Sequence, residues 1–224
     1  MQHTETSPPL PAYPNRFSIL LWFIITTASW TVGWALAVAL VNQIPYSLER
    51  MWPSLPFLVA SITAGGVIGL GQWLTLRKSL IGAWKWVPAT VVGMVLAVPV
   101  LYFGLILASD WAGPDLVRDL ANRYVAWLVP PLFGGLLAGT LAGTSQWLVL
   151  RGHPGAQVRQ LFVMVLGWTV GLAVIGVAWI FAFLMLVSDA PPELWPLGAV
   201  GGAVGGAIVG IVSGVAVASQ LRSG

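Results

Sequence analysis

Long stretches of hydrophobic residues follow one another along this chain, and short polar segments separate them. Six stretches contain no Asp, Glu, Lys, Arg or His, and they cover residues 17–43, 55–76, 86–109, 126–150, 161–188 and 195–221. About 20 apolar residues are enough for an α-helix to cross the hydrocarbon core of a bilayer. The pattern therefore predicts an all-α integral membrane protein with six spans.

Internal repetition orders these spans. The segment GLGQWLTLR at 69–77 recurs 74 residues later as GTSQWLVLR at 143–151, so the second and fourth predicted spans are copies. A shift of 71 residues aligns the glycines of the fourth span with those of the sixth, and WTVG at 30–33 recurs at 168–171. Two helices per copy return the chain to its starting side. The sequence predicts a six-helix bundle of three parallel helical-hairpin repeats with pseudo-threefold symmetry.

The repeat divides one membrane domain into segments. Residues 1–16 are polar and rich in proline, which predicts a disordered cytoplasmic tail. The three hairpins are expected at 17–80, 81–155 and 156–224. The apolar stretch that follows the tail is longer than a signal-peptide core of about 7–15 residues, so no cleavage is expected.

Composition and charge indicate that lipid is the main solvent. The chain is 58% hydrophobic and 8% charged, whereas a water-facing surface needs about 25% charged residues. A net charge of +3 is too small for a nucleic-acid-binding surface, and the lack of cysteine excludes disulfides and thiolate metal sites. Seven of the ten basic residues lie on the side of the termini: Arg16, Arg77, Lys78, Lys85, Arg151, Arg159 and Arg222. The positive-inside rule then predicts that both termini are cytoplasmic.

Glycines spaced mostly four residues apart mark the faces at which the spans should pack. Lipid tails are as apolar as Leu, so helices in a bilayer associate through close backbone approach and interhelical hydrogen bonds. The glycines expected at helix contacts are Gly65, Gly69, Gly135, Gly139, Gly143, Gly202, Gly206, Gly210 and Gly214. All of them belong to the second, fourth or sixth span. These three spans are therefore predicted to lie at the centre of the bundle.

Two glutamines stand out among the polar residues inside the spans. Gln72 and Gln146 each precede an arginine by five residues, which places them about 7.5 Å inside the expected headgroup layer. Gln220 is expected about one helical turn nearer the cytoplasm on a similar face, and Thr144 and Ser145 line the same zone. Two interpretations are open. The amides either bond to neighbouring helices or form a ring that binds a polar headgroup, a quinone or an ion.

Arginines at the cytoplasmic ends of these spans also repeat. Arg77, Arg151 and Arg222 form a predicted cationic ring, which either contacts anionic lipid headgroups or serves only as a topology signal. No catalytic residue, metal site or cofactor is expected. Both histidines, His3 and His153, lie outside the spans, and no apolar stretch contains paired carboxylates.

Tryptophans gather at the predicted ends of the spans. Trp73, Trp84, Trp86 and Trp147 fall at the cytoplasmic side, and indole rings favour the headgroup region of a bilayer. These four side chains are therefore expected to anchor the helices at the membrane surface.

The repeated segments carry a resemblance. With GxxQWLxLR at 69–77 and 143–151, and a Trp-rich helix start at 81–93, the chain resembles uncharacterised bacterial multi-pass membrane proteins that repeat a glycine-rich helix ending in QWLxLR. The resemblance implies a multi-pass helical fold in the bacterial inner membrane, and it implies no activity. We expect a non-catalytic scaffold or accessory subunit of a membrane complex, which contacts membrane lipids and other membrane-protein subunits and can hold lipid or another hydrophobic ligand. The alternative is a small-solute channel or transporter with a glutamine-lined constriction.

Overall fold

The computed structural model describes residues 18–112, 124–151, 158–187 and 195–223. Side chains are described at these positions except in 104–130, 179–195 and 220–223. Its helices are α1 (Ile19–Val41), α2 (Tyr46–Met51), α3 (Leu55–Leu76), the 3-10 turn η1 (Ala83–Lys85), α4 (Trp86–Ala112), α5 (Tyr124–Leu150), α6 (Val158–Val187) and α7 (Trp195–Ser223). No strand occurs in the described ranges. The protein is therefore all-helical there, as predicted.

Helix length and composition identify membrane spans. Five segments are long and apolar enough to cross a membrane: Ile19–Val41, Leu55–Leu76, Ala83–Phe103, Val158–Ala178 and Pro196–Ser219. The chain is therefore a multi-pass membrane protein. α5 is 27 residues long and covers the remaining predicted span, 126–150, whose crossing stays a prediction. The pattern does not predict α2 or η1, because such short helices bury no periodic apolar face.

Local chemistry explains where the first long helices begin. Ser18 caps α1, and its hydroxyl oxygen accepts a hydrogen bond from the backbone N–H of Leu21 at 3.3 Å. Pro56 lies in the first turn of α3, where the missing N–H costs no helical bond. Both helices then continue through uncharged residues to the opposite end of the bundle.

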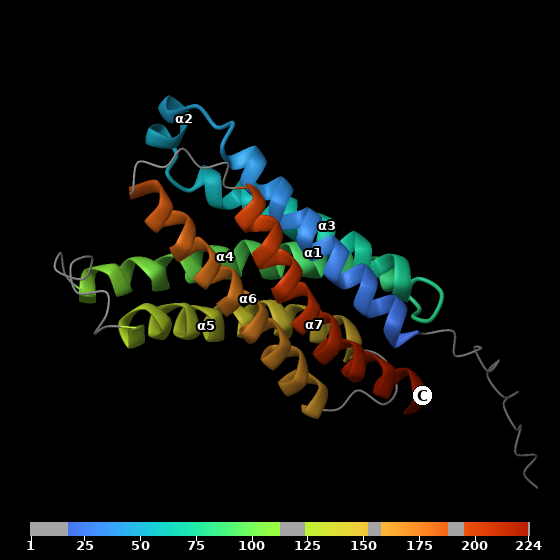
Figure 1. Cartoon of the computed structure of the whole chain (residues 1–224). Helices are drawn as coiled ribbons and strands as arrows, with labels where there is room; N and C mark the ends of the chain where they lie inside the picture. Colours follow the sequence, from blue (N-terminus) through green and yellow to red (C-terminus); the bar gives the residue numbers. More distant parts are fainter. Residues whose placement is uncertain (1–17, 113–123, 152–157, 188–194, 224) are drawn as a thin grey trace, which may run out of the picture.

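The six long helices pack as a closed ring in chain order. α1 packs on α3, α3 on α4, α4 on α5, α5 on α6 and α6 on α7, and α7 returns to α1. Figure 1 shows α7 running beside α1, although the two helices come from opposite ends of the sequence. In the described part of the chain, α3, α5 and α7 pack chiefly on these neighbours rather than on one another. The prediction that they occupy the centre is therefore wrong.

The predicted glycines line three of the six contacts in the ring. On α3, a Cβ added to Gly65 or Gly69 would lie 3.0 Å from Val91 Cα or 3.1 Å from Val87 Cα on α4. The glycines that α5 turns toward α6 are Gly135, Gly139 and Gly143. Those that α7 turns toward α1 are Gly202, Gly206, Gly210 and Gly214. Each glycine-bearing helix thus meets the next helix of the ring at close range.

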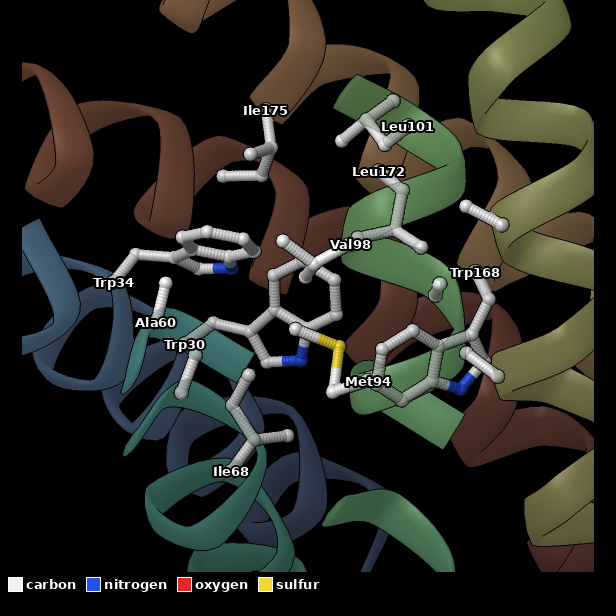
Figure 2. Packing of buried hydrophobic residues seen from close by; sticks show 14 of the residues in the cluster. Trp30, Trp34, Ala60, Ile68, Met94, Val98, Leu101, Trp168, Leu172 and Ile175 are labelled. Atoms are coloured by element: carbon white, nitrogen blue, oxygen red, sulfur yellow. The ribbon is translucent and has the colours of Figure 1, made fainter. Parts of the chain in front are cut away.

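Large side chains fill the middle of the ring. Figure 2 shows Met94 and the indoles of Trp30, Trp34 and Trp168 turned toward one another, and the rings of Trp30 and Trp168 lie 5.1 Å apart at 47°. These four residues come from α1, α4 and α6. Glycine permits close approach at the sides of a helix but supplies no volume for a core. For this reason α3, α5 and α7 lie in the wall of the ring, as the other three long helices do, and the indoles occupy its centre.

Gly139→Ala is expected to destabilise the bundle, because a Cβ there would overlap the backbone of Thr169 and push α5 away from α6. Overpacking of this kind costs about 1–3 kcal/mol. The matched control is Gly66→Ala on α3, where a Cβ would meet no atom within 4 Å. Thermal unfolding in detergent should give a lower midpoint for Gly139→Ala alone. Equal midpoints for the two variants would contradict the tight α5–α6 contact.

Candidate functional site

The structure brings the two repeated glutamines together inside the ring. Gln72 on α3 and Gln146 on α5 are both fully buried. Nε2 of Gln146 donates a hydrogen bond to Oε1 of Gln72 at 2.8 Å. Two residues that are 74 positions apart in the sequence therefore form one buried polar contact.

Two tryptophans complete this contact. Nε1 of Trp86 donates to Oε1 of Gln72 at 2.7 Å, and Nε1 of Trp168 donates to Oε1 of Gln146 at 2.9 Å. An indole N–H can only donate, so each indole requires the carbonyl oxygen of its glutamine to face it. This requirement fixes the orientation of both amides.

Thr90 on α4 accepts the second hydrogen bond from Gln146. Nε2 of Gln146 lies 2.9 Å from Oγ1 of Thr90, and that hydroxyl donates to the backbone carbonyl of Trp86 at 2.8 Å. Together Gln72, Trp86, Thr90, Gln146 and Trp168 form what we call the amide cluster. The cluster joins α3, α4, α5 and α6 through side chains buried from lipid and water.

The acceptors of the amide cluster are engaged, whereas one of its donor groups is not. Oε1 of Gln72 accepts two hydrogen bonds and Oε1 of Gln146 accepts one. Nε2 of Gln72 is buried and has no partner among the described residues. A cation filter needs carbonyl oxygens that face a lumen. The amide cluster instead presents spare N–H donors, which suit a hydrogen-bond acceptor.

A second buried polar contact joins α7 to α1. Nε1 of Trp22 donates to Oγ of Ser213 at 3.1 Å, and the Ser213 hydroxyl donates to the backbone carbonyl of Val209. The ring of Trp22 also meets that of Trp86 edge-on, with centroids 6.0 Å apart at 83°. Trp22 thereby places this contact next to the amide cluster.

Two further residues predicted for this zone, Thr144 and Ser145, lie outside the amide cluster. Ser145 returns its hydroxyl to the carbonyl of Ala142 at 2.7 Å, and Thr144 is half-buried beside it. The side chain of Gln220 lies outside the described residues. The structure therefore brings together two of the three predicted glutamines and leaves the third untested.

The predicted arginine ring is described at two positions. Arg77 and Arg151 directly follow α3 and α5, and both side chains are exposed. The guanidinium of Arg77 lies over the Trp73 ring, 5.6 Å from its centroid. The side chain of Arg222 lies outside the described residues.

Sequence reasoning missed the indole donors. Trp86 was expected to anchor at the membrane surface, but it is fully buried and bonded to Gln72, so that prediction is wrong. Trp84, two residues earlier, is 64% exposed, in keeping with a surface anchor. One signal was available in the sequence. An amide inside an apolar segment needs polar partners, and a chain with 13 tryptophans offers many indole N–H groups.

A cavity lies on the outer side of the α5–α6 pair. Its volume is about 250 Å³, and it is lined by Leu132, Thr169, Val170, Ala173, Val174 and Val177. Leu132 and Val170 are exposed, so the cavity opens toward the surface that faces acyl chains in a membrane. The lining is almost wholly apolar and suits a hydrocarbon chain.

Comparisons with protein-family models, curated proteins and solved structures found no match. Within the described residues, no group of three or more His, Cys, Asp or Glu side chains could hold a metal ion. The amide cluster, the cavity and the charged ends of the helices are therefore the features of the molecule that bear on its function.

A double-mutant cycle tests the amide cluster. Gln146→Leu leaves the Trp168 N–H buried without an acceptor, and an unsatisfied buried polar group costs about 1–3 kcal/mol. Gln146→Leu and Trp168→Phe should each lower stability, and the double variant should lose less than their sum. Unfolding in mixed micelles measures all three losses.

The control pair uses Trp30, which packs against Trp168 but whose indole N–H has no partner among the described residues. The losses of stability caused by Trp30→Phe and Gln146→Leu should be additive. Additive losses for Gln146→Leu with Trp168→Phe would instead show that the hydrogen bond contributes nothing.

Proposed function

We propose that this chain is a non-catalytic scaffold or accessory subunit of a membrane complex, which contacts neighbouring subunits and holds lipid or another hydrophobic ligand. Its proposed place is the bacterial inner membrane, with both termini cytoplasmic. Five helices able to cross a membrane support the multi-pass location. The excess of basic residues at the terminal side supports the orientation.

The observation that carries a scaffold role is the engagement of the amide oxygens. Both glutamine carbonyls accept indole N–H groups, so each oxygen already has a partner inside the protein, which competes with the coordination of an ion. Trp30, Met94 and Trp168 fill the neighbouring core. A polar contact sealed in this way favours a fixed helix arrangement over a filter. The glutamine-lined channel is therefore the weaker proposal.

We also propose that the hairpins α1–α3, α4–α5 and α6–α7 are three copies of one unit. Equivalent positions of the three hairpins occupy the same two core clusters, which supports the proposal. The equivalent sets are Trp30, Met94 and Trp168; Trp34, Val98 and Leu172; and Leu76, Leu150 and Val217. The predicted glycines line every second contact of the ring, α3–α4, α5–α6 and α7–α1, which agrees with this arrangement.

The proposed repeat assigns Ser213 to the position of Gln72 and Gln146. The preceding residues support this register, because Gly71 lies against Ser29, Ser145 against Gly93 and Val212 against Gly167. The shift from Gln146 to Ser213 is then 67 residues, four fewer than the shift of 71 taken from the glycine pattern. Glycines at every fourth position match themselves after a shift of four, so glycine spacing alone cannot select the register.

Reconstitution into liposomes tests the scaffold proposal against the channel. We expect liposomes that contain the wild-type protein to be no more permeable to glycerol and K⁺ than protein-free liposomes. Light scattering and a potential-sensitive dye measure the two rates. Flux that the wild type conducts and Gln146→Leu abolishes would overturn the scaffold proposal. The α7 variant Gly206→Leu, which should misfold the bundle, controls for leaks caused by damaged protein.

The cavity on α5–α6 gives a separate test of ligand holding. Val170→Trp should fill the cavity and reduce the number of lipids that stay bound to the purified protein, as counted by native mass spectrometry. The matched control is Val32→Trp, because Val32 holds the same place in the first WTVG segment and is likewise exposed. An equal lipid count in both variants would contradict a lipid in this cavity.

A further inference from the structure

The connector between α3 and α4, residues 77–85, has one side packed into the protein and one side open. Leu80 and Ala83 are buried in the core cluster that also holds Trp86. Ile81 and Trp84 are 73% and 64% exposed. A short connector that buries two apolar side chains and leaves two others exposed is built to contact a second apolar phase.

Backbone hydrogen bonds hold this connector in one conformation. The N–H groups of Ser79 and Leu80 donate to the carbonyl of Leu76 at 2.8 and 2.9 Å, and Lys85 N–H donates to the Gly82 carbonyl at 3.0 Å. Gly82 has a φ of 73°, a left-handed conformation that side-chain-bearing residues seldom adopt. The exposed side chains are therefore presented from a fixed surface.

Cations surround the exposed apolar pair. Arg77, Lys78 and Lys85 are all exposed, and the sequence has no Asp or Glu between Glu49 and Asp110. In Figure 1 this end of α3 lies at the same end of the protein as the start of α1 and the finish of α7, where basic residues dominate the sequence. No acidic side chain of the described residues therefore neutralises the positive charge of the connector.

A hydroxyl group adds a hydrogen-bond donor to these cations. Oγ of Ser79, next to Lys78 in the sequence, is buried and has no partner in the described part of the chain. A phosphate oxygen can accept from a hydroxyl and from ammonium or guanidinium groups at once. The connector thus combines cations, a spare hydroxyl donor and exposed apolar side chains.

We propose that residues 77–85 bind the headgroup of an anionic phospholipid. Arg77, Lys78 and Lys85 contact the phosphate region, while Ile81 and Trp84 insert at the boundary of the acyl chains. Charge complementarity selects an anionic over a zwitterionic lipid. The proposal relies on the membrane location given above but not on a scaffold role. It therefore stands or falls separately from the flux test.

Native mass spectrometry of the full chain can measure this selectivity. Protein is equilibrated in micelles with equal amounts of phosphatidylglycerol and phosphatidylcholine, and the ratio of retained lipids is counted. Wild type should favour phosphatidylglycerol, and Lys78→Gln with Lys85→Gln should lower that preference about tenfold. Equal retention of the two lipids by wild type, or an unchanged ratio in the double variant, overturns the proposal.

Two matched variants separate charge from structure. Lys78→Arg with Lys85→Arg keeps both charges and should keep the lipid preference, so its loss would overturn the proposal. Arg50→Gln removes an exposed cation from α2, away from the connector, and should leave the ratio unchanged. If Arg50→Gln lowers the preference as much as the lysine variant does, the connector is not the site.

A last arm distinguishes lipid from free phosphate. Inorganic phosphate alone should not reproduce the thermal stabilisation that phosphatidylglycerol gives in zwitterionic micelles, because it lacks the acyl chains that Ile81 and Trp84 contact. Equal stabilisation by inorganic phosphate would overturn the assignment to a lipid.

Discussion

A buried amide inside an apolar helix is the constraint on which this structure depends. Neither lipid nor the filled core offers Gln72 or Gln146 a hydrogen-bond partner, so each must find one on another helix. Trp86, Trp168 and Thr90 provide those partners. Because hydrogen bonds tolerate little displacement, the amide cluster fixes how α3, α4, α5 and α6 are placed along one another.

Glycine at the helix contacts makes these hydrogen bonds geometrically possible. Side chains at Gly139 or Gly65 would hold the helix pairs apart, and the amides could then not reach across the interior. The two devices act at different places. Glycines set the distance between neighbouring helices in the wall of the ring, while the amides and indoles set the depth at which the helices align.

Sequence reasoning recovers the part of this arrangement that follows from chain periodicity. Charge-free stretches predicted the long helices well, because each helix must satisfy its own backbone in lipid. The repeated QWLxLR segment alone identifies Gln72 and Gln146 as candidate site residues. Periodicity could not reveal which donors these amides find, since Trp86 lies 14 residues from Gln72 and Trp168 lies 22 residues from Gln146.

Other errors arose because glycine spacing carries too little information. A stripe of small residues tells which face packs, but not which helix it meets. For this reason the sequence predicts the helices that carry the stripes at the centre, whereas the structure has them in the wall of the ring. The same degeneracy lets the proposed repeat differ by one turn from the register that glycine spacing predicts for the sixth span. Only a polar or bulky residue, such as Ser213 or Trp22, breaks that degeneracy, and in the proposed repeat the third hairpin has serine in place of glutamine.

In the proposed repeat, serine stands where the other two copies have glutamine, and this difference accounts for the unpartnered donor of Gln72. Three glutamines in a ring could each donate to the next and close a cycle. Gln146 does donate to Gln72 and to Thr90. With Ser213 at the third place of the proposed repeat, the indole N–H of Trp22 donates to the serine hydroxyl. Gln72 is then the last member of an open chain, and its Nε2, like Oγ1 of Thr26 at the position of Thr90, lacks a partner among the described residues. In the proposed repeat, the serine of the third hairpin thus leaves hydrogen-bonding capacity at Gln72.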